Sequence, residues 1–285
     1  MGILLIPPAS IPGILSSEEI DLRDQLDGKF PGLPERISRL GELACNLWWS
    51  WHPEARSLFK MLGGNGSEFK SQNPAKLLQD LEGSVLEAAA RDSRFLRRYD
   101  AVMARFDSEM DPYGSWFHSK IADPSRYPIA YFSAEYGLHH SLPFYAGGLG
   151  FLAGDFLKEC SDLGVPATGV GFMYPEGYLH QKISPDGWQM NESEILDRLQ
   201  APISRVLDHD GRPLILKVPL TELNIYFEVW KAQIGRVPLI SSTLIRKGMT
   251  PGTARCRLAS ILAILSSGWS RRSPWASADL RSCRL

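Results

Sequence analysis

One stretch in the middle of the chain constrains the fold more than any other, because a strand, a glycine-rich loop, a helix and a second strand follow in that order. The apolar run "YPIAYFSAEYGL" is typical of a buried strand that leads into a loop. The run "GGLGFLAGDFLKECSDLG" predicts a loop that opens a helix, and "VPATGVGFMY" predicts the next strand. Strands joined through a helix build parallel sheets, so the sequence predicts an α/β domain here.

Three glycines lie at the predicted N-terminus of this helix: Gly147, Gly148 and Gly150. Unpaired backbone N–H groups and the positive end of the helix dipole can hold an anion there, and glycine allows a ligand to come close. Such loops often only make turns, so the spacing alone leaves both interpretations open. Gly164 is placed to end the helix. The apolar stripe expected to bury it is Leu149, Leu152, Phe156, Leu157, Cys160 and Leu163.

The first 120 residues show helical periodicity instead. In "PERISRLGELACNLWWSWHPEA" the pattern predicts one helix that begins near Pro34 and ends near Pro53. Trp48, Trp49 and Trp51 could form a platform for a sugar. We favour core packing for them, because large aromatic side chains dominate the energetics of protein cores.

Several function classes find no support in the composition. The net charge of -1 gives no general attraction to nucleic acid or to a membrane surface. No apolar run approaches the roughly 20 residues of a spanning helix. The four cysteines lack CxxC spacing, which argues against zinc and suits a reducing cytoplasm. "DHDG", residues 208–211, could supply metal ligands, but Asp-Gly favours a hairpin turn, so we expect no metal site.

These motifs together resemble the N-terminal catalytic region of the α-glucan phosphorylases. The resemblance rests on the Ser-x-Glu that follows a strand, the Gly-Gly-Leu-Gly turn, the leucine-rich helix and the "QKI…GWQ" stretch. Upstream, "LPERISRLGELACNLWWSWHPEARSLFKML" is similar to the helical domain of the shorter bacterial and archaeal members. The resemblance therefore implies a helical domain over residues 1–120. It implies that an incomplete Rossmann-like domain of a GT-B type glycosyltransferase follows over residues 121–239.

The resemblance also implies a reaction, in which phosphate cleaves the terminal α-1,4-linked glucose of a glucan or maltodextrin to give glucose 1-phosphate. It places Gly147, Gly148 and Leu149 at the substrate and the phosphate, and Glu135 beside the cleft as an ordering group. Tyr136 matches a position near the cofactor, although the family has a longer loop there. Pyridoxal 5'-phosphate is bound in the family through a lysine of the C-terminal domain, and that lysine is absent from this chain.

Two other functions compete with phosphorolysis. The glycogen synthases, which transfer glucose from a nucleotide sugar, share the two-domain architecture and a Gly-Gly-Leu turn after an S-x-E strand. In those enzymes the turn follows a lysine close to the chain start, whereas here it follows Tyr145-Ala146 and a helical domain. The chain could also be a non-catalytic glucan-binding or interaction protein.

The tail, residues 240–285, has a different character from the rest. It holds eight basic residues and one acid, whereas the preceding part carries a net charge of -8. Codons read one base out of step can spell "Y-L-L-D-T-D" after Leu239 and further family-like segments beyond. We therefore expect an out-of-frame tail, with a helix over 257–265 that packs poorly, and a fragment that is inactive by itself.

Overall fold

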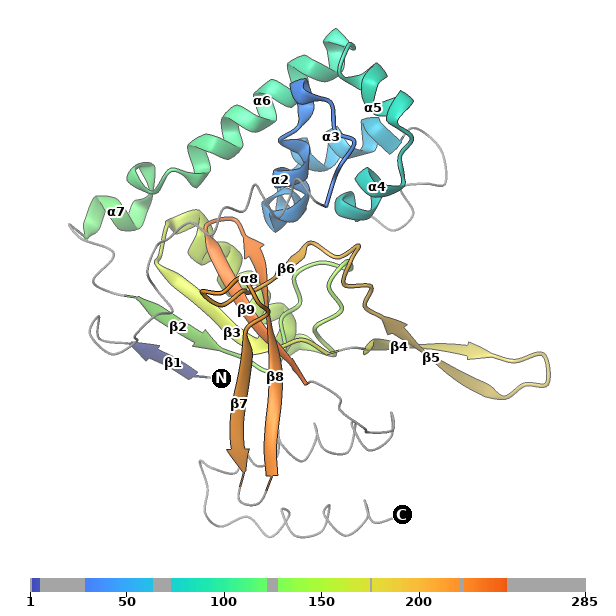
Figure 1. Ribbon diagram of the computed structural model, residues 1–285, viewed down its shortest axis with the longest axis vertical. Helices are drawn as coiled ribbons and strands as arrows, with labels where there is room; N and C mark the ends of the chain where they lie inside the picture. The colour runs from blue at the N-terminus through green and yellow to red at the C-terminus, as the bar shows by residue number, and fades with distance from the viewer. Residues whose placement is uncertain are drawn as a thin grey trace. The chain divides into compact units, whose positions relative to one another are not determined.

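The computed structural model of the chain describes residues 2–5, 29–63, 73–121, 128–174, 176–220 and 223–244. The chain divides into two compact units, residues 1–214 with 229–243 and residues 215–228 with 244–285. The first unit holds a helical part and most of a mixed sheet (Figure 1). The fold is therefore mixed α/β, as the sequence predicted.

The helical part contains six α-helices and three 3-10 turns among the described residues. Its elements are η1 (Glu35–Ile37), α2 (Leu40–Cys45), η2 (Leu47–Trp51), α3 (Pro53–Gly63), α4 (Pro74–Asp80), α5 (Gly83–Ala89), α6 (Ser93–Met110), η4 (Pro112–Gly114) and α7 (Trp116–Lys120). Trp48 and Trp49 are 1% exposed, which confirms that they pack in the core. Trp51 is only half-buried, and its indole N–H donates to Asp162 Oδ1 at 3.2 Å.

The single helix predicted between Pro34 and Pro53 is wrong. The segment is divided into η1, α2 and η2, and the break before η2 falls at Asn46, whose backbone is extended. The Asn46 side chain accepts a hydrogen bond from Trp48 N–H at 3.1 Å and so caps the following turn. An asparagine side chain that hydrogen-bonds to the backbone two residues further along the chain competes with the hydrogen bonds of a continuous helix.

The sheet of the first unit runs in the order β1-β2-β3-β9-β8-β6. Its strands are β1 (Gly2–Leu5), β2 (Ile129–Phe132), β3 (Ala167–Phe172), β6 (Ile203–Arg205), β8 (Leu223–Ile234) and β9 (Val237–Leu244). β2, β3 and β9 are mutually parallel neighbours, whereas β1 and β6 pair antiparallel with β2 and β8. The strand–loop–helix–strand unit predicted around the glycines is confirmed as β2, α8 (Gly148–Leu163) and β3.

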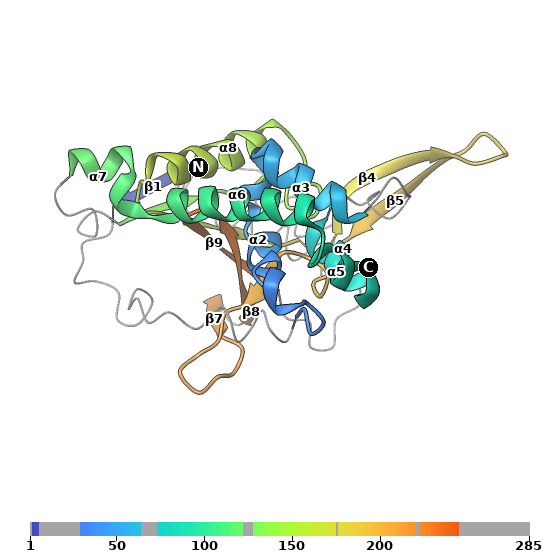
Figure 2. The same ribbon diagram turned by 90° about the horizontal axis from the view of Figure 1, so that it is seen from above.

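Helix α8 lies over this sheet (Figure 2), and its buried face matches the predicted stripe only in part. Leu149 and Leu152 belong to the expected buried stripe but are 46% and 61% exposed, so that part of the prediction is wrong. The buried face of α8 is made mostly of small residues, and it includes Leu157 and Cys160 as predicted: Gly150, Ala153, Gly154, Leu157, Cys160 and Ser161 are buried. Gly164 adopts the left-handed conformation, with φ 72°, and ends the helix as predicted.

Two hairpins lie outside the central strands. β4 (Glu176–Ile183) and β5 (Gln189–Ile195) form a separate two-stranded sheet in the first unit. In the second unit the outer part of β8 pairs antiparallel with β7 (Ile215–Leu220). The predicted turn at 208–211 is confirmed, because Asp208 Oδ1 accepts from the N–H groups of Asp210 and Arg212, and Gly211 has φ 74°.

Strand β9 crosses the position at which the unusual tail begins. Ile240 pairs with Val170, and Ser242 pairs with Phe172. The expected helix over 257–265 lies outside the described residues.

Candidate functional site

The first two glycines of the loop form an open surface at the start of α8. Gly147 is the N-cap of this 16-residue helix and, having no side chain, leaves the first turn uncapped. Gly147 and Gly148 are exposed, and a Cβ atom added to either would meet nothing within 4 Å. The first N–H groups of a helix lack intrahelical acceptors, so the amides here are available to a ligand.

Two other glycines have a packing role instead. A Cβ at Gly150 would lie 2.4 Å from Tyr145 Cβ, and one at Gly154 would lie 2.3 Å from the Gly137 carbonyl oxygen. The segment that carries Gly137 therefore touches the backbone of α8 directly. The glycines of this segment therefore differ in their surroundings: Gly147 and Gly148 leave open space, whereas Gly150 and Gly154 permit close contact between backbones.

The loop is held at both ends by the segment that follows β2. Tyr136 N–H donates to the Phe144 carbonyl at 3.1 Å, and Gly137 N–H donates to the Gly150 carbonyl at 2.7 Å. Within the loop, Glu135 Oε2 accepts from Ala146 N–H at 3.3 Å. Glu135 therefore contacts the loop through its carboxylate, at the residue that precedes Gly147.

Tyr136 does not share this open surface. The side chain is fully buried, and its hydroxyl lies 2.7 Å from the Tyr131 carbonyl. Burial raises the pKa of the hydroxyl well above its usual range. A contact between Tyr136 and a cofactor stays a prediction, and the hydrogen bonds of this hydroxyl are made with the strands. Sequence reasoning gave no role to Gly137 or Tyr174, whose hydroxyl donates to the Ala134 carbonyl at 3.0 Å.

His139 follows the same segment but faces the core. Its ring packs edge-on against Trp49 with 4.6 Å between centroids, and its Nδ1 accepts from Ser141 N–H at 3.1 Å. Burial, with the nearby His140 next, lowers its pKa to about 4, so the ring is neutral at pH 7. These contacts give His139 a packing role in the core.

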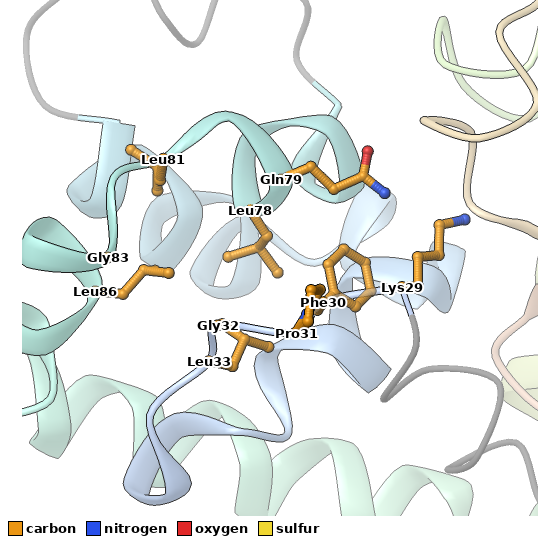
Figure 3. A pocket seen from close by; sticks show the side chains of 10 residues that line it. All are labelled: Lys29, Phe30, Pro31, Gly32, Leu33, Leu78, Gln79, Leu81, Gly83 and Leu86. Carbon is orange, nitrogen blue, oxygen red and sulfur yellow. The ribbon is translucent and has the colours of Figure 1, made fainter.

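An open pocket of about 250 Å³ lies in the helical part (Figure 3). Its walls are mainly apolar, with Phe30, Leu78 and Leu86 among them. The Lys29 ammonium points away from these side chains and donates to the Ala201 and Ile203 carbonyls at 2.5 and 3.3 Å. Ligand sites usually add converging polar groups to apolar walls, so this pocket gives no indication of a ligand.

Two features are absent from the part of the chain that the structure describes. No group of three or more His, Cys, Asp and Glu side chains there is arranged to hold a metal ion. In the same part of the chain, no helix has the length and apolar character needed to cross a membrane.

Comparison with known proteins shows which families and proteins this chain is similar to. Residues 33–142 match a family described as a protein of unknown function (DUF3417). The chain is 42% identical over 205 residues to a glycogen phosphorylase of Aquifex aeolicus, which covers 70% of this chain and 28% of that protein. It is 35% identical over 207 residues to a maltodextrin phosphorylase of Thermococcus litoralis, covering 73% and 25%. A glycogen phosphorylase of Mycobacterium tuberculosis is 37% identical over 217 residues, again covering 73% and 25%.

The chain thus spans only about a quarter of the length of these relatives. The matching DUF3417 family is the N-terminal region of phosphorylases. The resemblance carried by the glycine loop and its neighbours is confirmed, and over about 70% of its length the chain belongs to the glycogen and maltodextrin phosphorylase family.

Proposed function

We propose that residues 1–120 form the helical domain of a short-type α-glucan phosphorylase, and that residues 121–239 begin its N-terminal Rossmann-like, GT-B type domain. The parallel strands β2, β3 and β9, with α8 as the crossover between β2 and β3, support this division. The names of the relatives support phosphorolysis over a nucleotide-sugar transferase or a non-catalytic glucan-binding protein.

The role of the site follows from its open amides. We propose that the N–H groups of Gly147, Gly148 and Leu149 bind phosphate and the terminal glucose, while Glu135 orders the loop. The observation that carries this proposal is the uncapped, exposed start of α8, held in place from Glu135 to Gly137. Fixed backbone dipoles suit a reaction that joins a phosphate dianion to an oxocarbenium-like state.

We propose that the full-length form cleaves α-1,4-glucan or maltodextrin with phosphate to give glucose 1-phosphate. Pyridoxal phosphate supplies a phosphate group for proton transfer in the family. The described residues do not fit that cofactor, since Tyr136 is the one residue that the resemblance places near it, and its hydroxyl is buried between strands. We therefore propose that the cofactor lysine belongs to the part of the full-length enzyme outside this chain, and that this chain alone is inactive.

The free cysteines Cys45 and Cys160 support a reducing compartment. We propose the cytoplasm as the location of the protein.

Strand β9 supports the proposal that residues 240–285 are read out of frame. Ser241 is 1% exposed, and its hydroxyl has no hydrogen-bond partner among the residues that the structure describes. A buried hydroxyl without a partner costs about 1–3 kcal/mol, so it is an unusual choice in a strand interior. Synonymous codons allow the other reading frame to spell a leucine at this step of the strand, which would continue the buried apolar positions Val237 and Leu239.

The test is to express this chain and a chain whose frame is restored after codon 239. We expect the restored chain to form glucose 1-phosphate from maltodextrin and phosphate, and the chain of 285 residues to form none. Gly148→Val in the restored chain should lower turnover, because a larger side chain blocks the approach to the loop amides. Phosphorolysis by the 285-residue chain would contradict the proposal that catalysis needs the absent part.

A further inference from the structure

We infer that Tyr136 is a positioning residue for the loop amides of Gly147, Gly148 and Leu149, and that it acts through its phenol hydroxyl. The inference rests on the proposed role of this loop in binding phosphate. Because Tyr136 has no exposed surface, it cannot touch a ligand in this structure. Any influence on the site must therefore pass through its contacts.

The hydroxyl of Tyr136 joins the backbones of two neighbouring parallel strands. It donates to the Tyr131 carbonyl of β2 at 2.7 Å and accepts from the Val170 N–H of β3 at 3.2 Å. The phenol has one proton to donate and lone pairs to accept with, so both of these bonds form at once. The ring is thus anchored near the carboxyl ends of β2 and β3.

The backbone of the same residue holds the loop. Tyr136 N–H bonds to the Phe144 carbonyl before the exposed glycines, and Gly137 N–H bonds to the Gly150 carbonyl after them. The preceding residue, Glu135, accepts from Ala146 N–H inside the loop. A displacement of the backbone at Tyr136 therefore shifts all three attachments of the loop together.

A second residue fixes where the Tyr136 ring can lie. A Cβ atom at Gly171 would lie 2.7 Å from Tyr136 Cε2 and 2.7 Å from the Ser133 carbonyl oxygen. Gly171 thus makes room for the ring beside β3. Gly171→Ala displaces the ring without removing its hydroxyl, and it offers an independent way to disturb the same anchor.

Packing alone predicts a different outcome from positioning. If Tyr136 only fills space, Tyr136→Phe keeps the ring and leaves the loop in place. If the hydroxyl positions the loop, Tyr136→Phe leaves the Tyr131 carbonyl and the Val170 N–H without this partner, and the segment from Glu135 to Gly137 loses its anchor.

The experiment titrates inorganic phosphate into the ¹⁵N-labelled 285-residue chain at constant ionic strength. The shifts of the Gly147, Gly148 and Leu149 amides report the affinity at the loop. We expect Tyr136→Phe to weaken it about three- to tenfold, within the range of one net hydrogen bond. We expect Gly171→Ala to weaken it as well.

The matched control is Tyr99→Phe, which removes the hydroxyl of a buried tyrosine in α6. It should leave the phosphate affinity unchanged, even where it lowers the melting temperature as much as Tyr136→Phe does. A loss of phosphate affinity that merely followed lost stability in all variants would contradict the inference.

The remaining outcomes separate this inference from the proposed function. If the wild-type loop amides do not respond to phosphate, the proposed site is wrong and the inference falls with it. If they respond and a folded Tyr136→Phe variant has the same affinity, only the inference is wrong. Should Tyr136→Phe fail to fold, Gly171→Ala decides: weakened binding supports positioning, and unchanged binding overturns it.

Discussion

The side chain of Asn46 exchanges two hydrogen bonds with the backbone of Gly235, 189 residues further along the chain. Asn46 Nδ2 donates to the Gly235 carbonyl at 3.1 Å, and Gly235 N–H donates to Asn46 Oδ1 at 2.8 Å. Gly235 lies in the turn between β8 and β9, with φ 57°. This pair joins the helical part to the sheet at a buried position.

Asn46→Ala should therefore destabilise the fold. Gly235 N–H and Trp48 N–H lose their partner, whereas the Gly235 carbonyl keeps a hydrogen bond from Gln233 Nε2 at 2.9 Å. We expect the free energy of unfolding to fall by about 1–3 kcal/mol. Urea unfolding followed by tryptophan fluorescence measures the change. Asn191→Ala, on an exposed strand of the β4–β5 hairpin, is the control and should change stability by less than about 0.5 kcal/mol. Equal effects of the two substitutions would contradict the proposed importance of this pair.

The glycines of the loop should differ in their tolerance of alanine. Gly150→Ala brings a Cβ within 2.4 Å of Tyr145 Cβ, and we expect a loss of about 1–3 kcal/mol from this overpacking. Gly148→Ala meets open space and should leave the melting temperature within a few degrees of the wild type. Thermal unfolding of both variants checks the contrast. A destabilised Gly148→Ala variant would show that this glycine is needed for folding.

His139 should make stability fall in acid. Burial lowers its pKa to about 4 from an ordinary 6.5, so the unfolded chain binds a proton at higher pH than the folded one. Its contribution is complete above about pH 6.5 and is lost as the pH falls toward 4, by about 3 kcal/mol in total. His139→Asn keeps an acceptor for Ser141 N–H but cannot be protonated. Urea midpoints between pH 4.5 and 7.5 should therefore show a shallower slope for the variant, and equal slopes would contradict the prediction.

Two buried hydroxyls of β9 should respond in opposite directions. Within the described part of the chain Ser241 has no partner for its hydroxyl, so Ser241→Ala should raise the free energy of unfolding by about 1 kcal/mol. Thr243, two residues later, accepts from Arg198 Nη2 at 3.2 Å, and Thr243→Val should lower that free energy by a similar amount. Denaturant unfolding of the two variants provides the measurement. A loss of stability in Ser241→Ala would argue that this serine suits its place in the strand.

The sequence by itself determined the helix, strands and turns that are specified by residues close together in the chain. The order of strand, loop, helix and strand followed from apolar runs and glycine punctuation, and α8 ends at Gly164 because the left-handed conformation there favours glycine. The turn at 208–211 was predictable because an aspartate side chain such as that of Asp208 can accept a hydrogen bond from the backbone N–H two residues later. The motif around Glu135 and Gly147 also indicated the phosphorylase family, and the similarity to known phosphorylases confirms this prediction.

Only the tertiary structure decided which face of each element is buried and where a continuous pattern breaks. The helix predicted through Asn46 is interrupted where that side chain bonds to the backbone of both Trp48 and Gly235, and the second partner lies 189 residues away in the sequence. Leu149 and Leu152 are exposed although the periodicity favours burial, because α8 touches Gly137 through Gly150 and Gly154, and that contact turns small residues inward. The periodicity of a segment shows which of its faces is most apolar. How closely two backbones approach depends on the residues of both segments, and the sequence of one segment contains only half of that information.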